Sequence, residues 1–205
     1  MIALALGIAT DAPAALQRMI PDYTAALQGE DGQACEDGSC EPETQVEART
    51  DFAQCARGSG KDCGHLPAIG ASEWLNALGE PHGTVTLVDF WSSSCVNCAR
   101  EIPEIERIYE KYKDAGLVVI GVHSPQQAHE RDASVVSGAA SRLGITYPVA
   151  LDPELEAFQA YGATAWPTHY LAGPDGQLRS VGRGTSGLEE QVRALLTEAG
   201  ATLPD

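Results

Sequence analysis

From residue 66 onward, short unbroken apolar runs alternate with longer segments in which apolar residues recur at helical spacing. The runs at 85–91, 117–123 and 147–152 are too short for helices and are bounded by turn-forming residues, which predicts buried strands. The segment after residue 95 predicts a helix, because Ile102, Ile105, Ile108 or Tyr109, and Tyr112 share one face.

The remaining patterned segments predict further elements. Residues 125–144 favour a helix with Asp132 or Ser134 as its N-cap, and 153–162 favour another with Pro153 in its first turn. The runs THYLA and QLRSV flank GPDG and predict a hairpin. A last helix is expected between Ser186, as cap, and Gly200, as stop signal.

Residues 71–79, ASEWLNALG, predict a short helix or turn with Trp74 and Leu75 directed inward. Strands that alternate with helices indicate a parallel sheet, to which the hairpin adds antiparallel strands. The expected class is therefore α/β, with a central mixed sheet and helices on both faces.

The first third of the chain has a different character. Residues 11–28 have apolar positions at helical spacing, with Pro21 dividing them into two short helices. Residues 30–51 hold eight acids and one base without apolar periodicity, which is typical of an exposed linker. We therefore predict a helical N-terminal extension with a cysteine-containing linker over 1–65 and one domain over 66–205.

Composition narrows the choice of partners. A chain of 205 residues with 43% hydrophobic content can bury a core, and its net charge of -16 argues against nucleic acid or anionic membrane surfaces as partners. Residues 1–9, MIALALGIA, are apolar but too short to span a bilayer and lack a positive n-region. This raises the expectation that the sequence begins after a removed or omitted membrane segment.

The motif WSSSCVNC at 91–98 carries the clearest chemistry. Cys95 and Cys98 follow a predicted strand and open a predicted helix. Thiols at i and i+3 there lie on one face, within reach of a disulfide. The free N–H groups and positive dipole end of the first turn favour a thiolate, which makes Cys95 a candidate nucleophile. The alternatives are half of a zinc site, which lacks a second ligand pair just downstream, and a purely structural disulfide.

Four further cysteines precede the domain, and their even number and close spacing suit disulfides in an oxidising compartment. We favour the pairs Cys35 with Cys40 and Cys55 with Cys63, among three possible pairings. A four-thiolate metal site, with His65 replacing one ligand, and free cytosolic thiols are the alternatives.

The run VDFWSSSCVNCAREIP, together with GLVVIGVHSP, YPVALD and AYGATAWPTHYL, resembles the thioredoxin superfamily. The likeness is to its TlpA-like and DipZ-like branches, which are membrane-linked extracytoplasmic thiol reductases. It implies a thioredoxin-like fold in which 124–152 supply an extra helix and strand. It also implies a periplasmic or cell-surface location, as a soluble part of a membrane-anchored protein, a fragment of one or a shortened relative.

The resemblance also implies roles for individual residues. Cys95 would attack, Cys98 would resolve, and Asp89 would lie buried beneath the motif and take the proton of Cys98; an ordinary strand-end aspartate is the alternative. The loop at 166–168 would contain a cis proline and bind substrate beside the cysteines. The residues expected to contact substrate are Trp91, Trp166, Pro167 and Thr168.

The predicted function is thiol-disulfide exchange, in the direction that reduces protein disulfides, with electrons from a membrane donor of the DipZ/CcdA type and no cofactor or metal. Val96 and Asn97 between the cysteines replace the usual Gly-Pro, so the redox potential does not carry over. The alternatives are an oxidase that runs the exchange backwards, a Sco-type copper protein using His123 or His169, and a peroxidase, whose proline pattern SSSCVNC lacks.

Overall fold

The computed structural model describes residues 63–77 and 79–204. Within them, six strands form one mixed sheet in the order β1-β4-β3-β2-β5-β6. The strands β2, β3 and β4 are parallel and β5 and β6 join antiparallel, as the alternating pattern and the hairpin predict. The strand β1 also joins antiparallel, at the edge of β4. Their bounds are β1 (Trp74–Leu75), β2 (Val85–Trp91), β3 (Leu117–His123), β4 (Val149–Leu151), β5 (Thr168–Ala172) and β6 (Leu178–Gly182).

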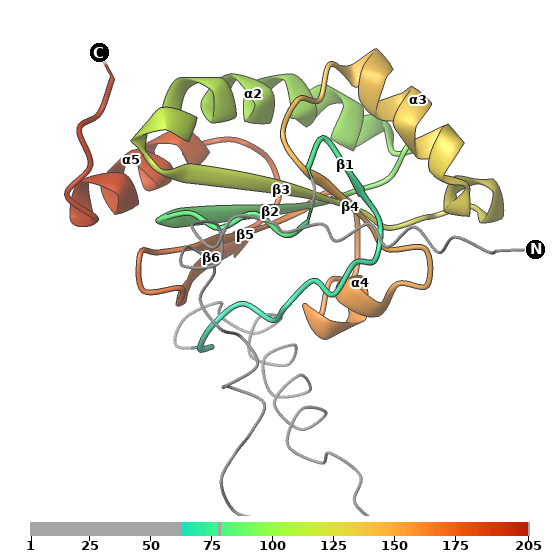
Figure 1. Cartoon of the computed structure of the whole chain (residues 1–205), viewed down its shortest axis with the longest axis horizontal. Helices are drawn as coiled ribbons and strands as arrows, with labels where there is room; N and C mark the ends of the chain where they lie inside the picture. Colours follow the sequence, from blue (N-terminus) through green and yellow to red (C-terminus); the bar gives the residue numbers. More distant parts are fainter. Residues whose placement is uncertain (1–62, 78, 205) are drawn as a thin grey trace, which may run out of the picture. The chain divides into compact units, whose positions relative to one another are not determined.

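Helices cover both faces of this sheet, which confirms the predicted α/β class. In Figure 1, α2, α3 and α5 lie on one face and α4 lies on the other. Residues 124–152, called the insertion below, supply the expected extra helix and strand, α3 and β4. The bounds of the helices, with two short 3-10 turns, are α2 (Val96–Tyr112), η3 (Lys113–Ala115), η4 (Ala128–Arg131), α3 (Ala133–Leu143), α4 (Glu156–Ala160) and α5 (Leu188–Glu198).

The longest helix, α2, forms where the apolar spacing predicts it. Ile102, Ile105, Ile108 and Tyr112 are buried against the sheet. Gly116 ends the helical segment with a φ of 102°, a left-handed conformation that glycine adopts without steric cost. This packing fixes the start of α2, which carries Cys95 and Cys98, above the end of β2.

The opposite face has an aromatic core. The Phe90 ring makes edge-to-face contacts with the rings of Phe158, Tyr161 and Tyr170 at centroid distances of 5.8, 5.1 and 5.6 Å. Such pairs add to the stabilisation from burial alone. Because Phe90 alternates with Asp89 and Trp91 along β2, the same strand supports this core and presents polar chemistry to the α2 face.

Three local predictions are wrong in detail. The first concerns Trp74 and Leu75, which form a short strand instead of a helix or turn. They pair with β4, and the Asn76 amide donates to the carbonyls of Ile145 and Tyr147 at 3.1 and 3.0 Å. The backbone groups at the open edge of β4 gain hydrogen-bond partners when residues 74 and 75 form a strand. This gain is larger than the preference of the local sequence for a helix.

The second concerns α4, which begins after Pro153 and not with it. The carboxylate of Asp152 accepts the N–H groups of Ala157 and Phe158, both at 3.0 Å. These bonds satisfy the free donors of the first turn from a residue that precedes the proline. The helix is therefore five residues long.

The third concerns α5, for which Ser186 was expected to be the cap. Gly187 occupies the cap position with a φ of 74°, and no side chain caps the helix. Glycine adopts this left-handed conformation without steric cost, and the helix begins at the next residue, Leu188. Ser186 lies one residue before this cap and is exposed.

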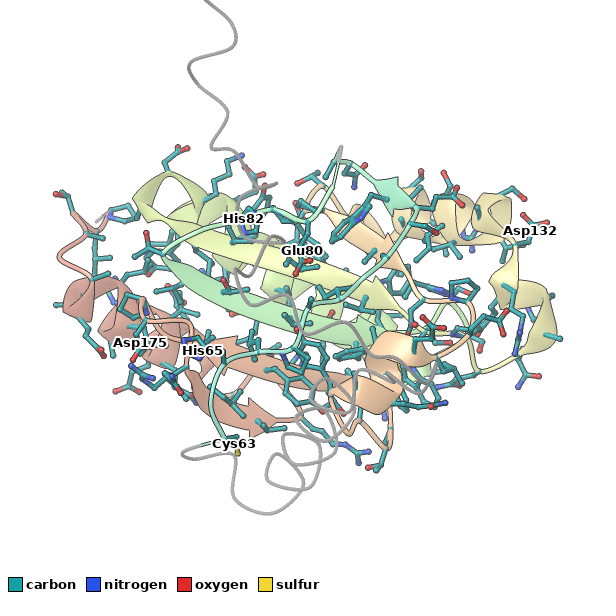
Figure 2. The ribbon with its side chains drawn as sticks, turned by 60° about the horizontal axis from the view of Figure 1, so that its bottom comes forward. Cys63, His65, Glu80, His82, Asp132 and Asp175 are labelled. Carbon is teal, nitrogen blue, oxygen red and sulfur yellow. A yellow bond between two sulfur atoms is a disulfide. The ribbon has the colours of Figure 1, made fainter. Side chains whose placement is uncertain are left out.

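The segment that precedes β2 runs along the sheet on the α4 side, with Cys63 and His65 on one stretch and Glu80 and His82 on another (Figure 2). Cys63 is disulfide-bonded. The predicted helices at 11–28 and the other expected staple residues lie outside the described residues, so both pairings stay predictions: Cys35 with Cys40, and Cys55 with Cys63. Across 63–77 and 79–204, no helix combines the length and apolar character needed to cross a bilayer.

Candidate redox site

Cys95 and Cys98 are joined by a disulfide at the start of α2, with their Cα atoms 5.3 Å apart. Cys95 is the N-cap residue, and its Sγ accepts the backbone N–H of Cys98 at 3.1 Å. The first turn carries no acidic side chain. After reduction, the free N–H groups and the positive helix end would therefore stabilise a thiolate at Cys95.

The two sulfur-bearing residues differ in their access to solvent. Cys95 is 8% exposed and Cys98 is 1% exposed. The neighbouring Val96 side chain is 65% exposed and marks the surface where the motif emerges. An outside molecule therefore reaches Cys95 first, which suits it as the attacking thiol and Cys98 as the resolving thiol.

The loop before Cys95 is held by a buried carboxylate that the sequence analysis missed. Glu130, from η4, accepts the hydroxyls of Ser92 and Ser93, both at 2.9 Å, and the backbone N–H of Gln126 at 2.6 Å. Burial alone would raise the pKa of Glu130, but the hydrogen bonds from the serine hydroxyls and the Gln126 N–H lower it to about 2. The three consecutive serines were the only local signal of such an anchor.

His123 supports the same loop from the end of β3. Its Nε2 accepts the backbone N–H of Ser93 at 3.2 Å, and its ring makes an edge contact with Trp91 at 4.8 Å. Burial lowers the pKa of His123 to about 4, so the imidazole is neutral and able to accept this bond at physiological pH. Trp91 is fully buried, and its expected contact with substrate stays a prediction.

Asp89 lies in β2, 1% exposed, and therefore does not face water. Within the described residues, neither of its carboxylate oxygens has a hydrogen-bond partner. Its near neighbour is His169, whose Nδ1 lies 3.1 Å from Oδ1 without the alignment of a hydrogen bond. The Nε2 of His169 lies 2.9 Å from Oε2 of Glu101 on α2. The sequence pattern suggests His169 only as a copper ligand and does not distinguish Glu101 from the other acidic residues of the helix.

Burial lowers the pKa of His169, but the carboxylates of Asp89 and Glu101 have the larger, opposite effect and raise the pKa to about 9. The histidine is therefore an imidazolium at neutral pH, placed between Asp89 and Glu101. A buried cation with anions on both sides is electrostatically compensated, which explains how β5 tolerates it.

The loop before β5 has the backbone that the resemblance implies. The Trp166–Pro167 peptide bond is cis. Trp166 stacks on Phe158 at 4.4 Å and also contacts the core cluster that contains both cysteines. Thr168 donates its hydroxyl to the Ala165 carbonyl at 2.7 Å. That these residues contact substrate stays a prediction.

No group of three or more histidine, cysteine or carboxylate side chains in the described part of the chain is arranged to hold a metal ion. A cavity of about 380 Å³ lies on the α4 side of the sheet, and no residue of the CxxC motif lines it.

Comparison with known proteins agrees with this geometry. The AhpC/TSA family matches residues 74–181. The chain is 39% identical over 225 positions to Protein DipZ of Mycobacterium bovis, covering 99% of the chain and 32% of that protein, so it spans about a third of this relative's length. It is 32% identical over 139 positions to the thiol-disulfide oxidoreductase YkuV of Bacillus subtilis, covering 63% of the chain and 91% of that protein. A solved thioredoxin-like protein in its oxidized form is similar with a TM-score of 0.59 and 28% identity, over 66% of the chain and 96% of that structure. These likenesses confirm the thioredoxin-like fold.

Proposed function

Because the chain belongs to the AhpC/TSA family and carries the disulfide of a thiol-disulfide oxidoreductase, we propose that it reduces disulfides in protein substrates. The observation that carries this proposal is the asymmetric pair at the start of α2. Cys95 is reachable and lies at a helix N-terminus, whereas Cys98 is buried one turn behind it. This arrangement suits an attacking and a resolving thiol.

The exchange takes place in two steps. In the reduced protein, the Cys95 thiolate attacks one sulfur of the substrate disulfide and forms a mixed disulfide, and the other substrate sulfur leaves as a thiolate, which takes its proton from solvent. Cys98 then attacks Cys95, forms the internal disulfide and releases the second substrate sulfur. Two electrons pass to the substrate, and the protein ends in the oxidised form seen here.

Asp89 is the proposed proton acceptor of the second step. It is buried in β2, and within the described residues its carboxylate oxygens accept no hydrogen bond, although His169 lies at ion-pair distance. It would take the proton of the Cys98 thiol and pass it to the departing substrate sulfur. This step leaves the number of protons in the system unchanged.

The cycle requires a donor that returns two electrons to the oxidised protein. The likeness to Protein DipZ supports a membrane-linked donor of the DipZ/CcdA type and an extracytoplasmic location, periplasmic or at the cell surface. A pair of disulfide staples before the domain would suit the same oxidising environment. The same chemistry run backwards is a dithiol oxidase, and the measured reduction potential distinguishes the two: a strongly reducing value supports the reductase.

Insulin reduction tests the activity. We expect the reduced protein to cleave insulin disulfides, Cys95→Ser to abolish turnover, and Cys98→Ser to accumulate a covalent mixed disulfide with substrate. Turnover and trapping are followed by thiol release and by mass spectrometry. Full activity in Cys95→Ser, or none in the wild-type protein, would refute the proposal.

A further inference from the structure

One imidazole joins two carboxylates that are far apart in the sequence. His169 on β5 lies 3.1 Å from Asp89 on β2 through Nδ1 and 2.9 Å from Glu101 on α2 through Nε2. Asp89 and His169 are register partners in the sheet, so backbone pairing fixes their approach. The redox helix, the strand beneath it and the strand after the cis-proline loop therefore meet at one charged group.

The three members differ in their contact with water. Asp89 and His169 side chains are 1% and 4% exposed, whereas that of Glu101 is 21% exposed. A cavity of about 100 Å³, lined by residues of β5, β6 and α5, adjoins His169. Among these three charged groups, Glu101 and His169 are therefore the ones nearest to solvent, and Asp89 is the innermost.

Few other charges face this group. Tyr147 is close enough to Asp89 for that carboxylate to add to the effect of burial, and the pKa of its hydroxyl is raised well above the usual value. The exposed Arg183 lines the cavity beside His169, and α5 contributes Gln191, which does not titrate. With Tyr147 neutral, Asp89 has one compensating cation within ion-pair distance among the described residues, and that cation is His169.

We propose that His169, held as an imidazolium by Glu101, keeps the buried Asp89 carboxylate ionised and thereby ready to accept the proton of Cys98. The inference rests on the proposed exchange through Cys95 and Cys98 and assigns His169 as its positioning residue. A lone carboxylate in apolar surroundings takes up a proton and loses its basic site. The imidazolium prevents this, and Glu101 prevents the imidazolium from losing its own proton.

The step balances without a further reactant. The Cys98 proton moves to Asp89, the bond between Cys95 and the substrate sulfur breaks, and the bond between Cys98 and Cys95 forms. The proton on Asp89 then neutralises the departing thiolate. His169 and Glu101 keep their protonation throughout, so they act on the step through charge.

The test isolates the Cys98 step and does not depend on a protein substrate. The reduced protein reacts with a nitrobenzoate disulfide whose leaving thiolate is coloured: attack by Cys95 releases the first thiolate and attack by Cys98 releases the second. In His169→Gln, we expect the acid limb of the second phase to move up by about one pH unit, which is about a tenfold slower step at pH values below the limb. The first phase should change little.

Two controls separate a charge effect from a folding effect. Glu104→Gln changes a carboxylate of the same helix that pairs with Arg107, and should leave the limb in place. In an Asp89→Asn background, adding His169→Gln should slow the second phase no further, because His169 acts through Asp89. An unshifted limb in His169→Gln, or additive slowing in the double variant, overturns the inference.

A direct titration covers the case in which the variants fold poorly. NMR of the wild-type imidazole should show His169 titrating near pH 9, and the same resonance should titrate at lower pH in Glu101→Gln. A wild-type His169 that is already neutral at pH 7 overturns the inference. If insulin is not reduced but the coloured second phase shows the shifted limb, the proposed function fails and the charge-setting role of His169 stands.

Discussion

At the scale of single residues, Glu130 determines the shape of the loop that presents Cys95. Its carboxylate accepts hydrogen bonds from Ser92 and Ser93 of the loop and from the Gln126 backbone, although its residue is only 1% exposed. An ionised acceptor with several donors makes stronger hydrogen bonds than a neutral one. The cost of burying this charge is thereby offset, and the loop gains a fixed geometry.

We predict that Glu130→Gln lowers the free energy of unfolding by about 2–4 kcal/mol, because the charge-assisted bonds weaken and the new amide N–H₂ faces other donors. Urea unfolding of the oxidised protein measures this. Glu154→Gln is the matched control, since Glu154 pairs with Arg131 on the surface with 67% exposure and should change stability by less than about 1 kcal/mol. Equal effects of the two substitutions would contradict the anchoring role.

Residues of the site divide into those that a local pattern reveals and those that it does not. Cys95 and Cys98 have a spacing, and Pro167 has a sequence neighbourhood, so the sequence predicts the disulfide and the cis bond. Glu130 and His169 have neither. Their roles arise from register and from packing between segments distant in sequence, and only the folded sheet brings them to the motif.

At the scale of elements, β3 shows how a strand makes room for its neighbours. Gly121 pairs with Asp89 in the sheet, and a Cβ added there would lie 2.9 Å from a Tyr147 ring carbon and 3.1 Å from the Trp91 indole nitrogen. Both rings are fully buried, and the close packing of protein interiors leaves little room for them to move. A side chain at this position would therefore separate the insertion from the strand beneath the redox motif.

Gly121→Ala should therefore lower the free energy of unfolding by about 1–3 kcal/mol through overpacking. Gly182→Ala on β6 provides the comparison, since its added Cβ would meet nothing within 4 Å. We expect that control to change stability by less than about 0.5 kcal/mol. Thermal and urea unfolding of both variants give the answer, and a stable Gly121→Ala protein would show that the rings can move.

Long, buried helices and strands are predicted from the sequence better than short ones. The strands β2 and β3 and the helix α2 have seven, seven and seventeen residues and strong apolar patterns, and the sequence predicts all three. Trp74 and Leu75 instead follow the demand of an open sheet edge, and the start of α4 follows the Asp152 side chain. Short elements are determined by tertiary contacts that a local pattern does not contain.

At the scale of the whole molecule, three buried groups near the redox motif contribute to how stability depends on pH. Burial lowers the pKa of His123 to about 4, and hydrogen bonds, against the effect of burial, lower that of Glu130 to about 2. Each favours folding at pH values above its unfolded pKa, and this contribution is lost as the pH falls towards the folded value. His169 behaves oppositely: its pKa is raised to about 9, so its contribution is complete below about pH 6.5 and is lost as the pH rises to about 9.

The oxidised protein should therefore be most stable near pH 6.5 and lose stability on both sides, with the alkaline loss due to His169. Using the oxidised form removes Cys95 and Cys98 from the titration, because disulfide sulfurs carry no proton. Urea midpoints between pH 4 and pH 9 should fall above neutrality in the wild-type protein and stay flat there in His169→Gln, whatever that variant loses at its maximum. The Glu104→Gln protein should retain the wild-type alkaline decline. If His169→Gln declined just as steeply between pH 7 and pH 9, the buried imidazolium would not be the group that couples folding to pH.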